Sequence, residues 1–425
     1  MSKTMDQIMT DTWLDVFTTK CSTWQNNATV SSAKKLLHPK IEEIMSADEG
    51  LRAKSEIQKW DGYKVTPLHY LEKIAKELRV ADIHLKDESS RFGLGSFKAL
   101  GGAYAVFRVL SQLIEKQTGD KNVNSADIRS GSYQTITKNN TVVTATDGNH
   151  GKSVAWGARE FGCQCKIYIH RDVSKGREQA IAEFGCEMVR VSGNYDLSVH
   201  QAHIDSQKNN WHVVSDTSYY GYMDVPKYVM QGYTILASEI GEQIIDKIPT
   251  HVFLPGGVGG IAAAISAELW RIWGKNRPKV IVVEPEAADC LYQSALSAKP
   301  AQSSGNLETV MACLSAGEVS LLAWDILSRS ANAFMILNDQ TIAPSMRRLA
   351  KEGIVSGESG AATLAGLAAA CQNPNSRISL GIDENSRILL LSTEGATDPH
   401  IYKKLVGIDA DKVVTTPLIL SLIHI

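Results

Sequence analysis

The 425-residue chain is short of several features that mark specialised protein classes. Its seven cysteines are unevenly spaced and do not form a disulfide framework, and their odd number favours a reducing compartment. No run reaches the roughly 18 apolar residues that a membrane-spanning helix needs. The N-terminal segment also lacks the apolar core and cleavage site of a signal peptide. We therefore expect a cytoplasmic protein with no membrane partner.

The chain has no strong excess of charge of either sign. Its 44 Lys and Arg residues nearly balance 46 Asp and Glu residues, giving a formal net charge of −2. Because phosphate backbones are bound by Lys and Arg, this balance argues against a basic nucleic-acid binder. The 44% hydrophobic and 21% charged residues are typical of a globular protein, and the length predicts two or three domains. Small acidic or zwitterionic ligands remain open.

Patterns of strands and helices alternate along most of the chain. Strands are predicted at 141–146, 165–169, 187–191, 212–214, 251–255, 279–284 and 387–391, and helices at 153–161, 175–184, 197–209, 228–240 and 261–273. Strands separated by helices indicate βαβ units and a mostly parallel sheet. Two such series, near 141–215 and after 250, predict two α/β domains with a cleft between them. The polar stretch 116–140 is predicted to be loop-rich.

A glycine-rich turn follows the predicted strand 251–255. Its residues are Gly256, Gly257, Val258, Gly259 and Gly260, and a predicted helix begins directly after them. Successive backbone N–H groups in such a turn, together with the positive end of the helix dipole, can hold an anion such as phosphate. A tight strand-to-helix turn without any ligand is the simpler interpretation.

The same turn also satisfies a dinucleotide-binding pattern. Gly257, Gly259 and Ala262 follow the glycine spacing of that fingerprint, and Glu284 ends the next strand, where a ribose-binding acid would stand. The turn alone does not decide between a phosphate site, a dinucleotide site and an empty turn.

Lys98 lies near the first turn of a predicted helix, after Gly93 and Gly95. A cation is disfavoured at a helix N-terminus, so the dipole is expected to push the amine toward its neutral form. A neutral lysine is a nucleophile toward an aldehyde and can form a Schiff base. Most lysines are solvated surface residues, but Phe97 and the small residues after Lys98 are unlike a solvated face.

Three motifs in order resemble those of fold-type II pyridoxal-phosphate (PLP) enzymes. Gly95-Ser96-Phe97-Lys98 resembles their lysine motif, residues 144–151 (TATDGNHG) resemble their Ser-Gly-Asn-His-Gly loop, and Gly256–Gly260 stands where they carry a phosphate loop. The resemblance implies two open twisted-sheet α/β domains with the PLP site in the cleft between them. It displaces the dinucleotide interpretation.

The resemblance also implies a domain layout and an assembly. We expect an N-terminal extension at 1–55, a large PLP-binding domain formed by 56–105 and 236–425, and a small α/β domain at 106–235. The family pattern further suggests a homodimer.

Two acidic residues narrow the expected substrate. Asp147 stands where ammonia-lyases normally carry Ser, and a carboxylate there can act as a base on Cα–H or hold a substrate cation. Asp216 follows a predicted strand and precedes aromatics that would wall a pocket, although an Asx turn would also explain it. Two carboxylates fit a substrate with a second ammonium group that leaves as ammonia.

Taken together, the motifs closely resemble the diaminopropionate ammonia-lyase family from about Val65 to about Lys404. The matching segments are KDESSRFG, TATDGNHG, VSDTSYYGY, VMQGY, VVEPEAADC, GIVSGESGAA and LLSTEGATD. The resemblance implies α,β-elimination of both enantiomers of 2,3-diaminopropionate to pyruvate and ammonia. It assigns Lys98 as the PLP lysine and Asp147 and Asp216 as bases on opposite faces of Cα.

The same resemblance implies further cofactor contacts. Asn149 would face the 3′-oxygen of PLP, and Ser392 or Thr393 would lie near the pyridine nitrogen. Two alternatives stay open: a serine or threonine ammonia-lyase or β-replacement enzyme on this scaffold, and a non-catalytic PLP or anion sensor.

Other candidate residues favour ordinary roles. His200 and His203 lack the partner spacing of a metal site and are expected to face solvent, so no metal is expected. Cys290 and Cys313 are expected to be free thiols rather than a disulfide. Glu358 would lie near the cofactor or only favour the N-terminus of the next helix.

Overall fold

The computed structural model describes residues 13–18, 22–27, 30, 36–146 and 148–413. Its larger sheet has seven strands in the order β1-β10-β9-β8-β11-β3-β2. In that order the strands are β1 (Ser22–Asn26), β10 (Ala333–Leu337), β9 (Lys279–Pro285), β8 (His251–Pro255), β11 (Arg387–Ser392), β3 (Asp82–Asp87) and β2 (Leu68–Tyr70). The central strands are parallel, and β1 and β2 close the two edges as antiparallel strands.

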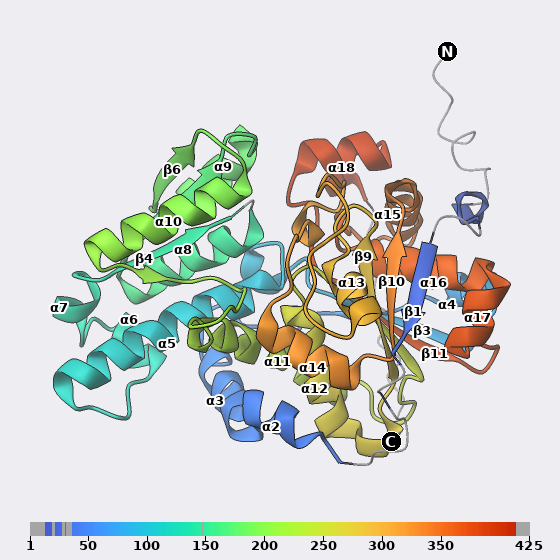
Figure 1. The fold of residues 1–425 in the computed structure, drawn as a ribbon, viewed down its shortest axis with the longest axis horizontal. Coiled ribbons are helices and arrows are strands. Elements are labelled where there is room, and N and C mark those ends of the chain that lie inside the picture. The colour runs from blue at the N-terminus through green and yellow to red at the C-terminus, as the bar shows by residue number, and fades with distance from the viewer. Residues whose placement is uncertain (1–12, 19–21, 28–29, 31–35, 147, 414–425) are drawn as a thin grey trace.

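The smaller sheet has four parallel strands in the order β6-β5-β4-β7. These are β6 (Glu187–Val191), β5 (Gln164–His170), β4 (Thr141–Ala145) and β7 (His212–Val213). Figure 1 shows this sheet in the green part of the chain, beside the larger sheet. The two α/β sheets confirm the fold class expected from the alternating pattern.

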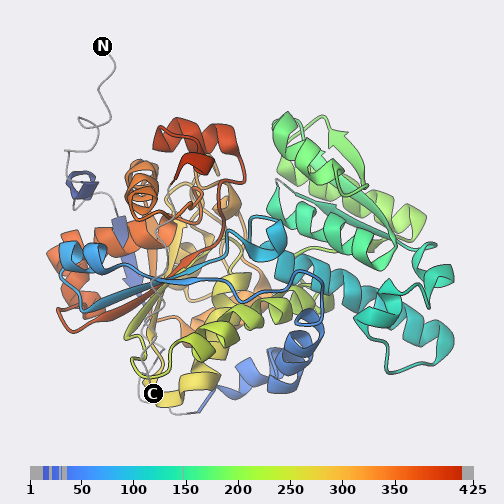
Figure 2. The same ribbon diagram turned by 180° about the vertical axis from the view of Figure 1, so that it is seen from behind.

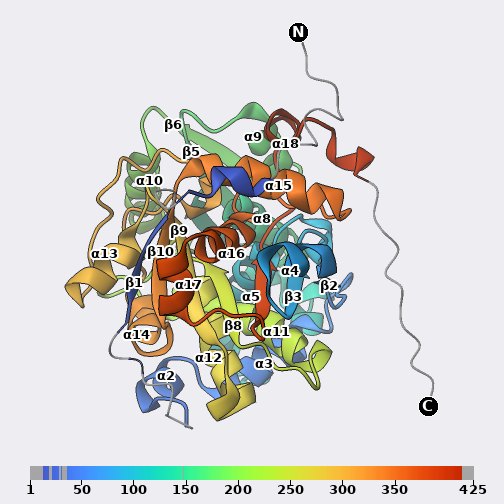
Figure 3. The same cartoon turned by 90° about the vertical axis from the view of Figure 1, so that its right-hand side faces the viewer.

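Both faces of the larger sheet are covered. In β8 the side chains of Val252 and Leu254 belong to one buried core, while that of Phe253 between them belongs to another. This alternation follows from the two-residue period of a strand, and burial of both faces is typical of parallel sheets. Helix α12 (Gly260–Trp273) contributes to the first core and α16 (Ala362–Gln372), visible in front of the sheet in Figure 3, to the second.

Two long helices join the sheets. Helix α5 (Lys98–Thr118) packs closely on α8 (Asn149–Phe161) beside the small sheet and on α11 (Asp224–Gln243) beside the large one, an arrangement that Figure 2 shows from behind. Glycines permit the close approach: a Cβ at Gly157 would lie 2.7 Å from Ala103 Cα, and one at Gly232 would lie 2.4 Å from Leu100 O. The segment that begins at Lys98 is therefore held rigidly between the sheets.

The remaining helices cover the sheets and their edges. They are α2 (Pro39–Ile44), α3 (Ala47–Ile57), α4 (Glu72–Leu78), α6 (Ser125–Arg129), α7 (Gln134–Thr137), α9 (Lys175–Ala182), α10 (Tyr195–Asn209), α13 (Cys290–Ser297), α14 (Leu321–Ser330), α15 (Ile342–Lys351), α17 (Pro374–Leu380) and α18 (Pro399–Val406). Short 3₁₀ segments are η1 (Trp13–Val16), η2 (Arg91–Gly93), η3 (Gly274–Asn276), η4 (Ala312–Leu314), η5 (Asp339–Thr341) and η6 (Ala410–Lys412). No helix in the described ranges is both long and apolar enough to cross a bilayer.

The stretch 116–140 differs from the loop-rich prediction. The structure extends α5 to Thr118 and adds the short helices α6 and α7. Asn124 caps α6 by accepting from Asp127 N at 3.0 Å, so a polar sequence is used for helix ends rather than for a long loop. The domain boundaries at 55, 105 and 235 stay a prediction, although β1, within 1–55, is paired with β10 of the large sheet.

Candidate active site

The candidate site residues gather where several strands end. Lys98 comes after β3, Asn149 after β4, Asp216 after β7, the glycine turn after β8, and Ser392 is the last residue of β11. The carboxyl ends of parallel strands share one edge of a sheet, which is where ligands bind in open α/β folds. The topology thus brings together five segments that the sequence spreads over about 300 positions.

Lys98 Nζ donates a hydrogen bond to the Asp216 carboxylate, and the two form an ion pair. Burial alone would lower the pKa of Lys98, but the negative charge of Asp216 outweighs it and raises the pKa. The expectation that the helix dipole makes this amine neutral is therefore wrong for the cofactor-free chain. The full negative charge of Asp216, in contact with Nζ, outweighs the partial positive charge at the helix N-terminus. Burial opposes ionisation of Asp216, but the Lys98 charge holds the pKa of that carboxyl well below its ordinary range.

His150 completes the surroundings of Asp216. Its ring Nε2 lies 2.9 Å from Val214 O, and its buried Nδ1 lies 3.9 Å from Asp216 Oδ2 without a hydrogen-bond partner in the described part of the chain. Burial lowers the pKa of His150, so the ring is neutral and Nε2 carries the proton that Val214 O accepts. The neutral His150 ring packs beside the Asp216 carboxylate and does not neutralise its negative charge.

The glycine turn has the backbone shape of an anion cradle. Gly257 and Gly259 have φ values of 59° and 96°, which only glycine adopts readily. A Cβ at Gly256 would lie 2.5 Å from Glu284 Cγ. The turn leads directly into α12, whose first N–H groups have no partner within the helix. Gly256 N donates to Val283 O at 2.8 Å and Gly259 N donates to Gly256 O at 3.1 Å. The N–H groups of Gly257, Val258 and Gly260 make no hydrogen bond within the described residues, so they are the donors left for a phosphate.

Glu284 is not available to a dinucleotide. Its carboxyl group is fully buried and accepts hydrogen bonds from Leu291 N at 3.0 Å and Tyr292 N at 2.7 Å, at the start of α13. Burial raises its pKa to about 8. An acid that caps a neighbouring helix from the interior cannot reach a ribose, so the geometry excludes the dinucleotide interpretation.

Asn149 and Glu394 face each other across the site. Asn149 Nδ2 donates to Glu394 Oε2 and also lies 3.3 Å from Cys313 Sγ. Glu394 directly follows Ser392 and Thr393 in the LLSTEGATD segment, but no local pattern marks it as a site residue. Cys313 likewise carries no sequence signal beyond that of a free thiol. Their position at this site depends on contacts between distant segments, which no local pattern reports.

The two candidate hydroxyls at the end of β11 have different surroundings. The Ser392 side chain is fully buried and donates to Ser356 Oγ at 2.8 Å. Thr393 is 4% exposed, and its carbonyl accepts from Phe97 N at 3.1 Å. That backbone contact places the end of β11 directly against the segment that carries Lys98.

A cavity of about 940 Å³ opens beside these residues. Its lining includes Gly95, Lys152, Arg177, Thr397 and Asp398, and so comes from the segments of both sheets. Arg177 Nε, on α9, lies 3.8 Å from Asp398 Oδ2 on the other side. The cavity lies between segments of the two sheets, but its lining includes none of the predicted site residues Lys98, Asn149, Asp216, Gly256–Gly260 and Ser392.

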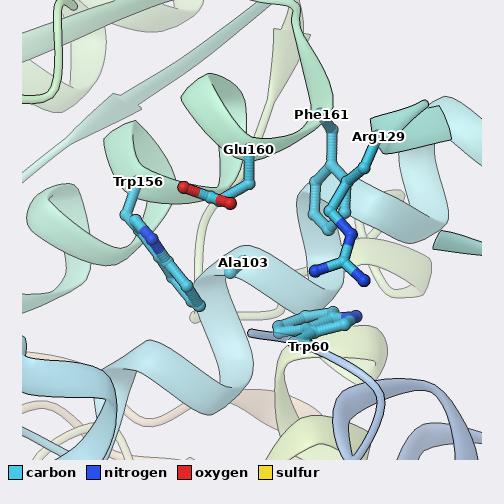
Figure 4. Close-up of a pocket in the computed structure, with 6 residues that line it drawn as sticks. All are labelled: Trp60, Ala103, Arg129, Trp156, Glu160 and Phe161. Carbon is cyan, nitrogen blue, oxygen red and sulfur yellow. The ribbon is translucent and has the colours of Figure 1, made fainter. Parts of the chain in front are cut away.

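A second hollow does not serve as a ligand site. It is lined by Trp60, Ala103, Arg129, Trp156, Glu160 and Phe161 (Figure 4). The ring of Trp60 lies 5.9 Å from that of Trp156 and 5.5 Å from that of Phe161, measured between centroids. Since the hollow has no room for a water molecule, it is part of the packing between α5 and α8.

Some predicted residues are placed elsewhere. Asp147 lies outside the described residues. Tyr220, expected in a pocket wall after Asp216, is 89% exposed, while the Tyr222 hydroxyl donates to Val213 O at 2.8 Å and supports the strand end instead. His200 and His203 are exposed, as expected.

The remaining candidates have defined surroundings. Cys290 and Cys313 are free thiols, as expected. Glu358 is 3% exposed, and burial together with the charge of Glu394 raises its pKa to about 7. Glu358 therefore lies near the site rather than serving only the following helix.

Comparison with known proteins identifies the family. A model of the pyridoxal-phosphate dependent enzyme family matches residues 59–393. The diaminopropionate ammonia-lyase of Salmonella typhimurium is 37% identical over 82% of this chain and 89% of its own length. The chain belongs to the diaminopropionate ammonia-lyase family. The Escherichia coli relative is 35% identical over 88% of this chain and 94% of its own. Its crystal structure with D-serine has a TM-score of 0.81 and covers 91% of this chain and 96% of that one.

The residues of this diaminopropionate ammonia-lyase family member fit pyridoxal 5′-phosphate, the cofactor of the family. The turn at Gly256–Gly260 offers N–H donors for a phosphate, and Lys98 offers an amine for an aldehyde. Asn149 and Ser392 offer an amide and a hydroxyl for the ring substituents. The donor types and the backbone shape are compatible with this group.

Proposed function

We propose that the protein catalyses the α,β-elimination of 2,3-diaminopropionate to pyruvate and ammonia. The supporting observation is the Lys98–Asp216 ion pair, together with a glycine turn whose backbone suits an anion, in a chain whose family is named for this reaction. A basic group and a carboxylate in contact provide both an attachment point for the cofactor and an acceptor for a proton.

Lys98 and the glycine turn would hold the cofactor. The turn Gly256–Gly260 would hold its phosphate through the backbone N–H groups that are not bonded within the protein, and Lys98 Nζ would hold its aldehyde carbon. Asn149 would donate to the 3′-oxygen, and Ser392 or Thr393 would place a hydroxyl near the pyridine nitrogen. Pyridoxal phosphate, when bound, supplies an acceptor for the electron pair released at Cα.

Asp216 would take the proton from Cα on one face of the substrate. In the structure the Lys98 charge holds the pKa of Asp216 low and makes it a weak base. Once that charge is no longer beside it, the carboxylate gains basicity. Asp147 would serve the opposite face, so that both enantiomers would be substrates. General acid–base assistance of this kind contributes about 10²–10⁴-fold to rate.

The atoms balance in a simple elimination. The Cα–H bond breaks toward the base, a Cα–Cβ double bond forms, and the Cβ–N bond breaks to release ammonia. The released 2-aminoacrylate takes up water to give pyruvate and a second ammonia. His150 keeps Asp216 in place by closing the site behind it.

A pyruvate assay with each diaminopropionate enantiomer tests this proposal. The wild type should form pyruvate from both, Asp216→Asn should lose mainly one enantiomer and Asp147→Asn mainly the other. Faster turnover of serine would favour a serine ammonia-lyase, and cofactor binding without turnover would favour a sensor. Lys98→Ala should lose the absorbance at about 410–420 nm that arises when the cofactor is joined to the lysine.

We also infer a cytoplasmic homodimer. The free cysteines among the described residues are consistent with a reducing compartment, and the dimer follows from the family resemblance. Sedimentation equilibrium should give twice the 46.4 kDa chain mass.

A further inference from the structure

Glu394 is a buried carboxylate inside the candidate site. Glu394 is 2% exposed. Its carboxylate accepts hydrogen bonds from several neutral groups. These donors are Asn149 Nδ2, Ser359 N at 3.2 Å, Cys313 Sγ at 3.2 Å and Thr397 Oγ1 at 3.4 Å. The two oxygens are therefore fixed in place by groups from four segments.

No cation neutralises this carboxylate in the described part of the chain. Within those residues no Lys, Arg or His nitrogen lies within 4.0 Å of a Glu394 oxygen, whereas Asp216 has Lys98 in contact. The pKa of the Cys313 thiol is raised well above its ordinary value, first by burial and then by the negative charge of Glu394. A buried carboxylate without a cation is costly, which indicates that a positive ligand completes the site.

The backbone of Glu394 is joined to the lysine segment. Ser96 and Glu394 form an isolated β-bridge, and Gly395 N donates to Gly95 O at 3.0 Å. The carboxylate thus lies between the segment that carries Lys98 and the Asn149 amide. A substrate bound beside Lys98, on a cofactor that Asn149 contacts, would present its side chain close to Glu394.

We propose that Glu394 binds the side-chain ammonium of the substrate and so selects diamino acids over hydroxy amino acids. This inference rests on the proposed function, because it assigns the specificity of that same site. Diaminopropionate and serine differ only in the group on Cβ, which is an ammonium in one and a hydroxyl in the other. In the complex, the substrate ammonium would donate to the Glu394 carboxylate in place of the Cys313 thiol. A charged donor would thus replace a weak one.

The same contact assists the reaction. A carboxylate beside the Cβ nitrogen keeps that nitrogen protonated, so that it leaves as ammonia rather than as an amide ion. With serine bound, the Glu394 carboxylate would have no cation beside it. A site that is built to bind a charged group discriminates strongly against a ligand without that charge.

Calorimetric titration of the holoenzyme tests the assignment without turnover. The two ligands are 2,4-diaminobutyrate and homoserine, which share a chain length, have no leaving group on Cβ and differ in the terminal ammonium or hydroxyl. Wild type should bind diaminobutyrate at least about tenfold more tightly, the effect expected of one charged hydrogen bond. Equal affinities in the wild type overturn the inference whether or not any variant folds.

Glu394→Gln removes the charge and keeps the shape. The variant should lose at least about tenfold in affinity for diaminobutyrate and keep its affinity for homoserine within about twofold. Loss of both affinities together would show a merely structural role and overturn the inference. Glu286→Gln, a change at an exposed glutamate on the loop after β9, is the matched control and should leave both affinities unchanged.

Turnover separates the two proposals. If wild type forms no pyruvate from diaminopropionate, the proposed function fails while the titration still reports on Glu394. If wild type is active, the readout is the ratio of kcat/KM for diaminopropionate to kcat/KM for serine. If this ratio is the same in Glu394→Gln as in wild type, the inference fails and the proposed function stands.

Discussion

Lys98 and Asp216 are 118 positions apart in the chain and form an ion pair that joins segments of the two sheets. The lysine begins the helix that joins both sheets, and the aspartate follows the last strand of the small one. Each residue sets the protonation of the other, since the pKa of Lys98 is raised and that of Asp216 is lowered. The cofactor-free protein therefore holds its reactive amine in the charged, unreactive form.

Removal of the Asp216 carboxylate should increase the neutral, reactive fraction of the Lys98 amine. In Asp216→Asn, burial is no longer opposed by a contacting charge, so the pKa of Lys98 falls and its neutral fraction rises about tenfold per pKa unit. Labelling of the cofactor-free protein with an amine reagent at pH 8, followed by peptide mass spectrometry, should show at least about tenfold faster modification of Lys98. Asp224→Asn, at an exposed position on α11, should leave the labelling rate unchanged.

The glycine turn should not tolerate a side chain at its first position. In Gly256→Ala the new Cβ would lie 2.5 Å from Glu284 Cγ, so the turn must move. Overpacking of this kind typically costs about 1–3 kcal/mol, and the moved N–H groups should bind pyridoxal phosphate less tightly. Fluorescence titration of the cofactor measures the second effect. Gly50→Ala, where the nearest atom lies at 3.5 Å, should bind the cofactor as the wild type does.

A buried ionic network supports the segment before Lys98. Arg91 pairs with Glu88 and Glu239 at 2.8 Å each, Lys86 pairs with Glu239 at 2.7 Å, and all four side chains are at most 1% exposed. In Arg91→Met, two buried carboxylates lose a partner, and the free energy of unfolding should fall by about 3–5 kcal/mol. Urea denaturation measures the loss.

An exposed ion pair provides the comparison. Lys76 and Glu72 are 2.6 Å apart on the surface of α4, and both side chains are more than half exposed. Lys76→Met should change the urea midpoint little, because water solvates the remaining charge. Similar losses in Arg91→Met and Lys76→Met would contradict the role assigned to the network.

The stability of the protein should depend on pH through Glu284. Burial raises its pKa from 4.5 to about 8 in the folded chain, so between these values the folded state binds a proton that the unfolded state has lost. The free energy of unfolding therefore contains a contribution that is fully present below about pH 4.5 and lost as the pH rises through 8.

Glu284→Gln should remove that contribution. Urea denaturation of wild type and variant at pH 5.5 and pH 8.5 should show a smaller fall in stability with pH for the variant. Glu286→Gln, two positions away and exposed, should keep the wild-type pH dependence. An identical pH dependence in wild type and Glu284→Gln would mean that Glu284 is ionised throughout.

The sequence predicted the local parts of this molecule well where one pattern dominates. The strands at 141–145, 251–255 and 387–392 lie where β-branched and apolar residues cluster, because such runs favour a buried parallel strand. The stretch 116–140 was mistaken for a loop, since short capped helices leave the same polar composition as a loop. Strand β1 was missed because its pairing partner β10 lies more than 300 positions away.

By itself the sequence determined the fold class, the lysine, the glycine turn and the family motifs, because each is a contiguous pattern with a local physical cause. Only the tertiary structure decided that Lys98 is charged, that Glu284 is withdrawn from any ligand and that Glu394 lies beside Asn149. Charge state and pairing depend on the distance to groups far along the chain. Those distances are set by how α5, α11 and the ends of the two sheets pack together.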